Sequence, residues 1–165
     1  MFTLGEIIDL AIRIEKNGEE IYRKAQEEVS NPSLAAMLKW LADEEVEHEK
    51  WFTRLKEKTE TGAVDPKLEE MGMAILQGVL GDQAFSIKDA DFSKIEDVNS
   101  LLELSIEFEK DTVLFYEMLG AFIDDEEILS QLDKIIEEEK RHAQLLEEFL
   151  EKKTALPVNG VPPRA

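Results

Sequence analysis

The sequence contains no cysteine among its 165 residues. This absence excludes disulfide bonds, thiolate zinc sites and iron–sulfur clusters held by this chain. It also suits a reducing compartment, and we expect a cytoplasmic protein. No apolar run approaches the roughly 20 residues that span a bilayer. The first residues, Met1 to Glu6, lack the basic start and apolar stretch of a signal peptide, so no membrane partner is expected.

Positive charge is also scarce. The chain has 19 Lys and Arg residues against 38 Asp and Glu, which gives a formal net charge of −19. A surface this acidic repels nucleic acid and anionic membranes, so neither is an expected partner. The same charge is typical of a soluble, Glu-rich helical protein, and by itself it says little about function. Histidine is rare as well, with only two in the chain, His48 and His142.

Both histidines belong to a set of four residues that occurs twice. In each half, a tyrosine lies seven positions after a glutamate, and a Glu-x-x-His pair follows further along. Corresponding members are always 94 positions apart: Glu15 and Glu109, Tyr22 and Tyr116, Glu45 and Glu139, and His48 and His142. Apolar positions repeat at the same offset, for example Leu38 with Leu132. The chain is therefore interpreted as two similar helical hairpins.

The hydrophobic pattern places these hairpins at about 4–58 and 98–152. Apolar residues recur at helical spacing in both, and the pattern is interrupted by turns at Asn31-Pro32 and Asp124-Asp125. We therefore predict an all-α fold, a four-helix bundle made of two hairpins joined by a long crossover.

The remaining segments complete the predicted domain organisation. The crossover, about 59–97, is too long for a tight turn, and a short helix is expected in it from about Pro66 to Leu80. The bundle is expected to occupy 1–153 as one domain. The last segment, 154–165, contains three prolines and a glycine and is expected to be a flexible tail.

The spacing brings the glutamates of each hairpin to the same level. Glu15 lies 16 residues before the first turn and Glu45 lies 14 residues after it. At 1.5 Å per residue these are about 24 Å and 21 Å along antiparallel helices. Glu109 and Glu139 are equally level around the second turn. Residues three apart share a helix face, so each histidine lies beside its glutamate.

These polar residues also interrupt apolar stripes. Glu45 and His48 lie between Leu41 and Phe52 on the stripe of their helix. Burying a carboxylate costs several kcal/mol unless it is paired, and four that face one another would repel. Two divalent cations would cancel this charge, and carboxylates with imidazoles suit iron or manganese. One Glu-x-x-His pair alone usually lies on a solvated surface, but its repetition on buried faces favours a metal site.

The neighbouring residues are given ordinary roles. The two tryptophans, Trp40 and Trp51, are expected to pack or to be partly exposed. The other glutamates near the histidines are expected to be solvated: Glu44, Glu47, Glu49, Glu137 and Glu138.

The six ligand-type residues resemble those of the ferritin-like di-iron carboxylate proteins, and among them the rubrerythrin-like family. That arrangement takes one Glu from each of two helices and Glu-x-x-His from each of the other two. It is matched by Glu15, Glu45-Val46-Glu47-His48, Glu109 and Glu139-Lys140-Arg141-His142. The resemblance covers both hairpins, about two thirds of the chain. It implies a ferritin-like bundle that binds two iron ions, with manganese or zinc as substitutes.

The resemblance also implies a role for each residue. Glu45 and Glu139 would bridge the two ions. The other ligands would divide between the ions, Glu15 with His48 and Glu109 with His142. The hydroxyls of Tyr22 and Tyr116 would bond ligand carboxylates across the bundle, Tyr22 to Glu109 and Tyr116 to Glu15, and so orient the ligands.

Two features differ from rubrerythrins proper. Those proteins carry a cysteine-ligated rubredoxin module, which this chain cannot form, so electrons would come from an external electron-transfer protein. They also use an additional glutamate near the third-helix ligand, whereas the residue three positions after Glu109 is Thr112.

The resemblance implies a di-iron oxidoreductase of peroxidase type. It would reduce hydrogen peroxide or dioxygen, serve in oxidative stress and form a homodimer. One alternative is a ferroxidase and iron-storage protein, which shares the site chemistry but needs a hollow assembly of many subunits. A further alternative is a helical interaction protein with a structural metal site, against which the retention of six ligands and two tyrosines argues.

Overall fold

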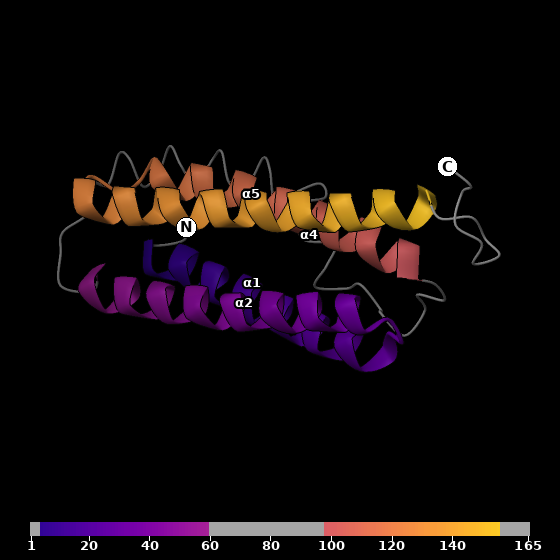
Figure 1. The fold of residues 1–165 in the computed structure, drawn as a ribbon. Coiled ribbons are helices and arrows are strands. Elements are labelled where there is room, and N and C mark those ends of the chain that lie inside the picture. Colours follow the sequence, from indigo (N-terminus) through magenta and orange to yellow (C-terminus); the bar gives the residue numbers. More distant parts are fainter. Residues whose placement is uncertain (1–3, 60–97, 156–165) are drawn as a thin grey trace.

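The computed structural model describes residues 4–59 and 98–155 (Figure 1). These residues contain no strand and form four α-helices: α1 (Leu4–Glu28), α2 (Pro32–Thr59), α4 (Val98–Gly120) and α5 (Glu126–Ala155). The predicted all-α class and both predicted hairpins are confirmed. No helix within the described ranges combines the length and hydrophobicity of a membrane span.

Two predicted segments fall largely outside the described residues. The crossover and its helix at 66–80 lie there entirely. Of the predicted tail, α5 includes residues 154 and 155, and the rest lies outside the description. The single-domain boundary at 153 therefore stays a prediction.

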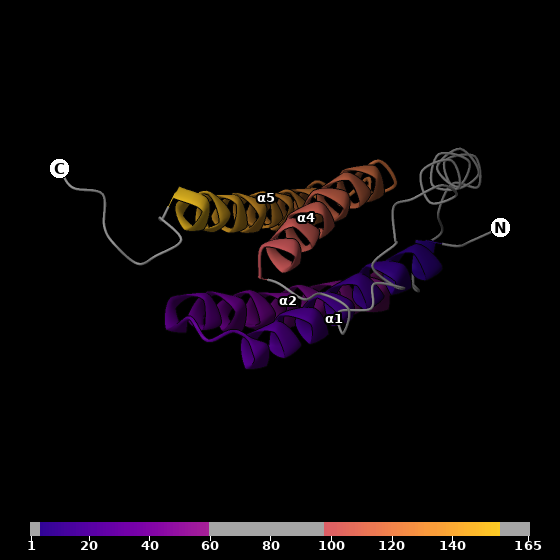
Figure 2. The same ribbon diagram turned by 90° about the vertical axis from the view of Figure 1, so that its right-hand side faces the viewer.

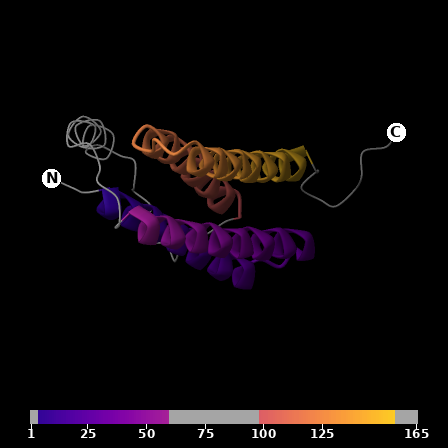
Figure 3. The ribbon, with the colours of Figure 1, turned by 90° about the vertical axis from the view of Figure 1, so that its left-hand side faces the viewer.

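The two hairpins form two stacked layers. Helices α1 and α2 lie side by side in one layer, and α4 and α5 in the other (Figures 1 and 2). The view from the opposite side shows the same two layers (Figure 3). Helix α1 also contacts α4 between the layers. This arrangement turns one face of every helix towards a common interior.

Both hairpin turns have simple chemical causes. The Oδ1 atom of Asn31 accepts hydrogen bonds from the main-chain N–H groups of Ser33 and Leu34, at 2.9 and 3.1 Å. Pro32 takes the first helical position, where its missing N–H is not needed. Asp125 caps α5 in the same way, through N–H groups two and three positions further on at 2.9 and 3.0 Å. These caps fix where α2 and α5 begin. They therefore decide which residues of α2 lie level with those of α1, and which residues of α5 lie level with those of α4.

The interior is apolar apart from a few side chains. Within the described ranges, the buried polar or charged residues are Glu15, Glu45, His48, Ser105, Glu109, Thr112, Glu139 and His142. Ser105 and Thr112 donate their hydroxyl hydrogens to main-chain carbonyls one turn back, at 2.8 and 2.9 Å. The other six are the predicted ligands, so the core contains one unusual feature and it lies where the sequence predicts it.

Candidate metal centre

The six ligand-type side chains converge between the two hairpins. Two groups form, and in each group the ligand atoms lie within 4.8 Å of one another. The groups are Glu15, Glu45, His48 and Glu139, and Glu45, Glu109, Glu139 and His142. Glu45 and Glu139 belong to both groups, as bridging ligands would. The structure thus brings all six residues together, and the binding of a metal by each of them stays a prediction.

Unsatisfied polar atoms support a metal site. Five of the six side chains have one buried carboxylate oxygen or Nδ1 atom without a hydrogen-bond partner in the described part of the chain: Glu15 Oε2, Glu45 Oε1, His48 Nδ1, Glu109 Oε2 and Glu139 Oε1. In His142 the unpartnered atom is Nε2, and its Nδ1 contacts Glu139. A buried polar atom left without a partner costs about 1–3 kcal/mol, and such atoms are rare in native proteins. Their concentration in one carboxylate and imidazole cluster fits two divalent cations.

Glu139 lies at the centre of the cluster. Its Oε1 is 2.8 Å from Nδ1 of His48, and its Oε2 is 3.0 Å from Nδ1 of His142. The first contact is close, but its angle is not that of a hydrogen bond. The two imidazole rings stack with their centroids 5.9 Å apart. Glu139 therefore touches both histidines, which is the position a shared ligand needs.

The two tyrosines connect the hairpins beside this cluster. The hydroxyl of Tyr22 donates to Oε1 of Glu109, and that of Tyr116 donates to Oε1 of Glu15. These are the two pairings that the family resemblance implies. Burial, with the nearby carboxylates, raises the pKa of both phenols well above the usual range, so both remain donors. Each tyrosine occupies one carboxylate oxygen, and the other, Oε2, is buried without a hydrogen-bond partner.

Comparisons with known proteins agree with this geometry. Residues 6–90 match the family model for rubrerythrin, and residues 67–152 match that for the ferritin-like domain. The first match covers more than half of the chain. The chain belongs to the rubrerythrin family. No curated protein sequence matches this member of the family.

One solved structure shares the fold of this rubrerythrin-family chain. It is a crystal structure from Thermotoga maritima, provisionally described as a ferritin-like diiron-carboxylate protein. The two sequences are 22% identical, the TM-score is 0.68, and the match covers 92% of this chain and 97% of that one. This likeness confirms the ferritin-like bundle.

Protons offset part of the carboxylate charge in the protein alone. Burial raises the pKa of Glu45 and of Glu109 well above the usual range, and the negative charge of Glu139 raises both further. Both shifts favour the protonated form of these side chains. A cation that enters the cluster therefore competes with protons there.

Glu139 and His48 behave in the opposite way, as an ion pair. Burial raises the pKa of Glu139, but its contacts with His142 and His48 outweigh burial and lower the pKa below the usual range. Burial lowers the pKa of His48, but its contacts with Glu139 and Glu15 outweigh burial and raise the pKa to about 12. His48 therefore carries a proton that a metal must also displace.

Several contacts of the site were not predicted from the sequence. Glu138 is exposed, as expected of a solvated side chain, but it does not point away from the site, because its Oε2 lies 2.8 Å from Nε2 of His48. Glu44 is half-buried and lies near the same two residues. Trp40 is 42% exposed, yet its ring lies 5.3 Å from that of His142 at 83°. Helical spacing did not predict the contact of Glu138. This residue precedes Glu139, and adjacent residues of a helix point about 100° apart, so the two are expected on different faces.

Gly18 is a further residue that sequence spacing did not single out. A Cβ at this position would lie 3.1 Å from Cε1 of Phe108 and 3.2 Å from both Cδ and Oε2 of Glu45. Both neighbours are buried, so neither can easily move away. Gly18 thus lets α1 approach the carboxylate that belongs to both groups.

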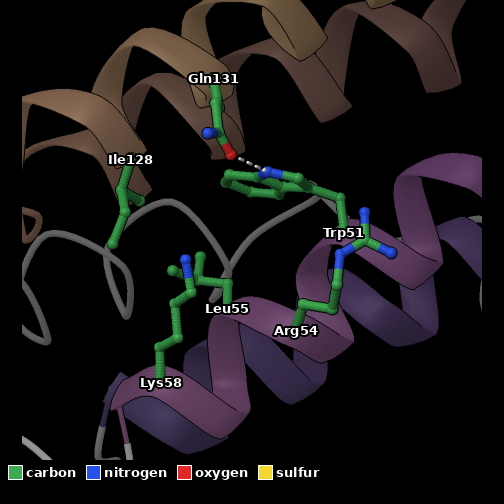
Figure 4. A pocket seen from close by; sticks show the side chains of 6 residues that line it. All are labelled: Trp51, Arg54, Leu55, Lys58, Ile128 and Gln131. Carbon is green, nitrogen blue, oxygen red and sulfur yellow. Dashed lines mark hydrogen bonds between the residues drawn. The ribbon is translucent and has the colours of Figure 1, made fainter.

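A surface pocket between α2 and α5 is separate from the cluster (Figure 4). Its lining contains none of the six cluster residues and consists of Trp51, Arg54, Leu55, Lys58, Ile128 and Gln131. Trp51 donates its indole hydrogen to Oε1 of Gln131 at 2.7 Å. This bond joins the two hairpins at the surface, and it gives Trp51 the packing role expected of it.

Proton release should accompany metal binding. The raised pKa values of Glu45, Glu109 and His48 favour their protonated forms, and protons compete with metal, so the affinity for Fe(II) should fall as the pH falls. Anaerobic calorimetric titration in two buffers of different ionisation enthalpy measures the release as a difference in heat. Equal heats in both buffers, or tighter binding at lower pH, would contradict this account.

A methyl group at Gly18 should disturb the site. In a helix interior, alanine usually stabilises the helix by up to about 1 kcal/mol relative to glycine. At position 18, however, its Cβ would lie 3.2 Å from Cδ and Oε2 of Glu45. We expect Gly18→Ala to weaken Fe(II) binding measured by calorimetry. Gly120→Ala is the matched control, because its Cβ would meet only ordinary contacts at 3.6 and 3.7 Å. Equal Fe(II) affinities in the two variants would show that Gly18 has no such role.

Proposed function

We propose that this chain is a di-iron oxidoreductase that reduces hydrogen peroxide or dioxygen with electrons from an external carrier protein. The observation that carries the proposal is the pair of overlapping groups that share Glu45 and Glu139. Two groups with common carboxylates suit two ions side by side, which a one-metal structural site does not need. Membership of the rubrerythrin family supports the same chemistry.

The division of ligands follows from the two groups. Glu45 and Glu139 would contact both ions. The remaining ligands would be Glu15 with His48 for one ion, and Glu109 with His142 for the other. Two iron ions held there would supply the two electrons that, with two protons, convert one hydrogen peroxide molecule into two waters.

The rest of the machinery would act by positioning and shielding. Tyr22 and Tyr116 each hold one oxygen of Glu109 and Glu15, which fixes the orientation of these carboxylates and leaves their other oxygens without a hydrogen-bond partner. All four glutamates are at most 1% exposed, which keeps bulk water from the ligands. An external carrier is proposed because the chain has no cysteine for a second redox centre of rubredoxin type. The proposed assembly is a homodimer.

Iron oxidation and storage is the second candidate. The match of residues 67–152 to the ferritin-like domain favours it, since the same ligand set serves both activities. The two candidates differ in assembly, because storage needs a hollow shell of many subunits. Size-exclusion chromatography with light scattering distinguishes a dimer from such a shell.

Metal content is the direct test of the site. We expect two iron or manganese ions per chain in reconstituted protein, measured by elemental analysis. Glu139→Ala should lose at least one ion, because Glu139 belongs to both groups. Glu137→Ala is the control, because it removes the same charge from a carboxylate that pairs with Lys140 at the surface. No more than one ion in the unaltered protein would count against the proposal.

Turnover should depend on an added electron carrier. We expect hydrogen peroxide to oxidise the di-ferrous protein quickly, after which consumption stalls until a rubredoxin-type carrier and its reductase are supplied. Anaerobic stopped-flow absorbance follows the oxidation, and a peroxide electrode follows the stall. His48→Ala and His142→Ala should both slow oxidation, because each removes the single nitrogen ligand proposed for its ion.

Two results would redirect this proposal. Oxidation by dioxygen at or above the rate with peroxide would favour the ferroxidase function. Sustained peroxide consumption with NADH and no carrier would contradict the need for an external electron-transfer protein.

A further inference from the structure

The two histidines have different surroundings, although they correspond in the internal repeat. At the 94-residue offset, Glu44 corresponds to Glu138, and Trp40 corresponds to Lys134. A site that obeyed the repeat would give each histidine one outer carboxylate from the opposite hairpin. The structure instead places both carboxylates around His48.

His48 has a carboxylate on its outer nitrogen. Oε2 of Glu138 lies 2.8 Å from Nε2 of His48 and is the hydrogen-bond partner of that atom. Ligand atoms of Glu44, His48 and Glu138 all lie within 4.8 Å of one another. The contact joins α5 to α2, so it also fixes the ring of His48 relative to the opposite hairpin.

His142 has a different outer environment. Its Nε2 is buried and has no hydrogen-bond partner in the described ranges. The ring of Trp40 lies 5.3 Å from the ring of His142 and is nearly perpendicular to it. An indole ring can pack against an imidazole, but its only polar group is an N–H donor and it offers no carboxylate oxygen.

This difference affects how each ring can present its inner nitrogen. An acceptor at Nε2 holds one hydrogen there, so that the proton which a metal displaces is the one on Nδ1. Nδ1 is the atom that faces the cluster in both histidines, 2.8 Å from Glu139 in one and 3.0 Å in the other. Glu138 therefore prepares His48 for metal binding, and no described residue does the same for His142.

We propose that the two metal positions are unequal, and that Glu138 is a positioning residue that makes the His48 position the first to fill. The His142 position, with Trp40 in place of a carboxylate, fills second. This inference rests on the proposed metal site, but it concerns the order of binding and not the reaction.

Zinc is a suitable probe because it is redox-inactive and diamagnetic. The chain has only two histidines, so a long-range ¹H–¹⁵N spectrum of the imidazoles contains two sets of signals, which His142→Gln assigns. We expect the first equivalent of Zn(II) to shift the Nδ1 signal of His48 and the second to shift that of His142. Calorimetry should resolve two binding steps.

Substitution of Glu138 tests the cause of the order. Loss of such an outer partner typically lowers metal affinity about 10- to 100-fold, and we expect this loss in the first Zn(II) step of Glu138→Ala. Glu138→Gln keeps an acceptor oxygen and should lose less. Glu137→Ala removes the same charge one position away and should leave both steps unchanged. The side chains of Glu138 and Glu137 are 51% and 72% exposed, so the variants should fold, which circular dichroism checks.

The possible outcomes separate this inference from the proposed function. If two zinc ions bind in one step, or if the His142 position fills first, the inference is overturned but the metal site is not. Equal losses of Zn(II) affinity in Glu138→Ala and Glu137→Ala would show that only the loss of a negative charge matters. That result would also overturn the inference. Zinc that shifts neither histidine would contradict the metal site itself, and the inference with it.

Discussion

The burial of four carboxylates at one level of a helical bundle is the constraint on which the rest of this structure depends. Glu15, Glu45, Glu109 and Glu139 are at most 1% exposed, and mutual repulsion in such a place opposes folding. In the protein alone, the raised pKa values of Glu45 and Glu109 and the ion pair between Glu139 and His48 lessen this repulsion. Protons and cations therefore compete for the same carboxylates.

The same constraint explains the architecture around the cluster. Carboxylates can share cations only if they stand level, and the caps at Asn31 and Asp125 set that level within each hairpin. Hydrogen bonds from Tyr22 and Tyr116 then hold the hairpins together across the site. The apolar stripes supply most of the packing, while these few polar contacts decide how one hairpin sits on the other.

The sequence predicted the elements and the cluster because both depend on position along a helix. Helical spacing and turn residues located the four helices, and the 94-residue offset paired Glu45 with Glu139 and His48 with His142. The contacts of Glu138, Trp40 and Gly18 could not be predicted in this way. They depend on how far each helix is rotated and how closely two helices approach, which packing preferences fix only within about 15–20°. A side chain at the edge of a buried face can therefore lie in solvent or against a neighbouring helix, and spacing does not distinguish these cases.

The repeat and its exceptions occupy different parts of the molecule. The four glutamates of the cluster, both histidines and both tyrosines match at the offset, and these eight residues are buried. The positions that differ in environment lie at the rim, where Trp40 is 42% exposed and the side chain of Glu138 is 51% exposed. A change in the interior would leave a cavity or an unpaired charge, whereas a change at the rim costs little packing. The rim is thus where two halves built alike can acquire different properties without loss of the fold.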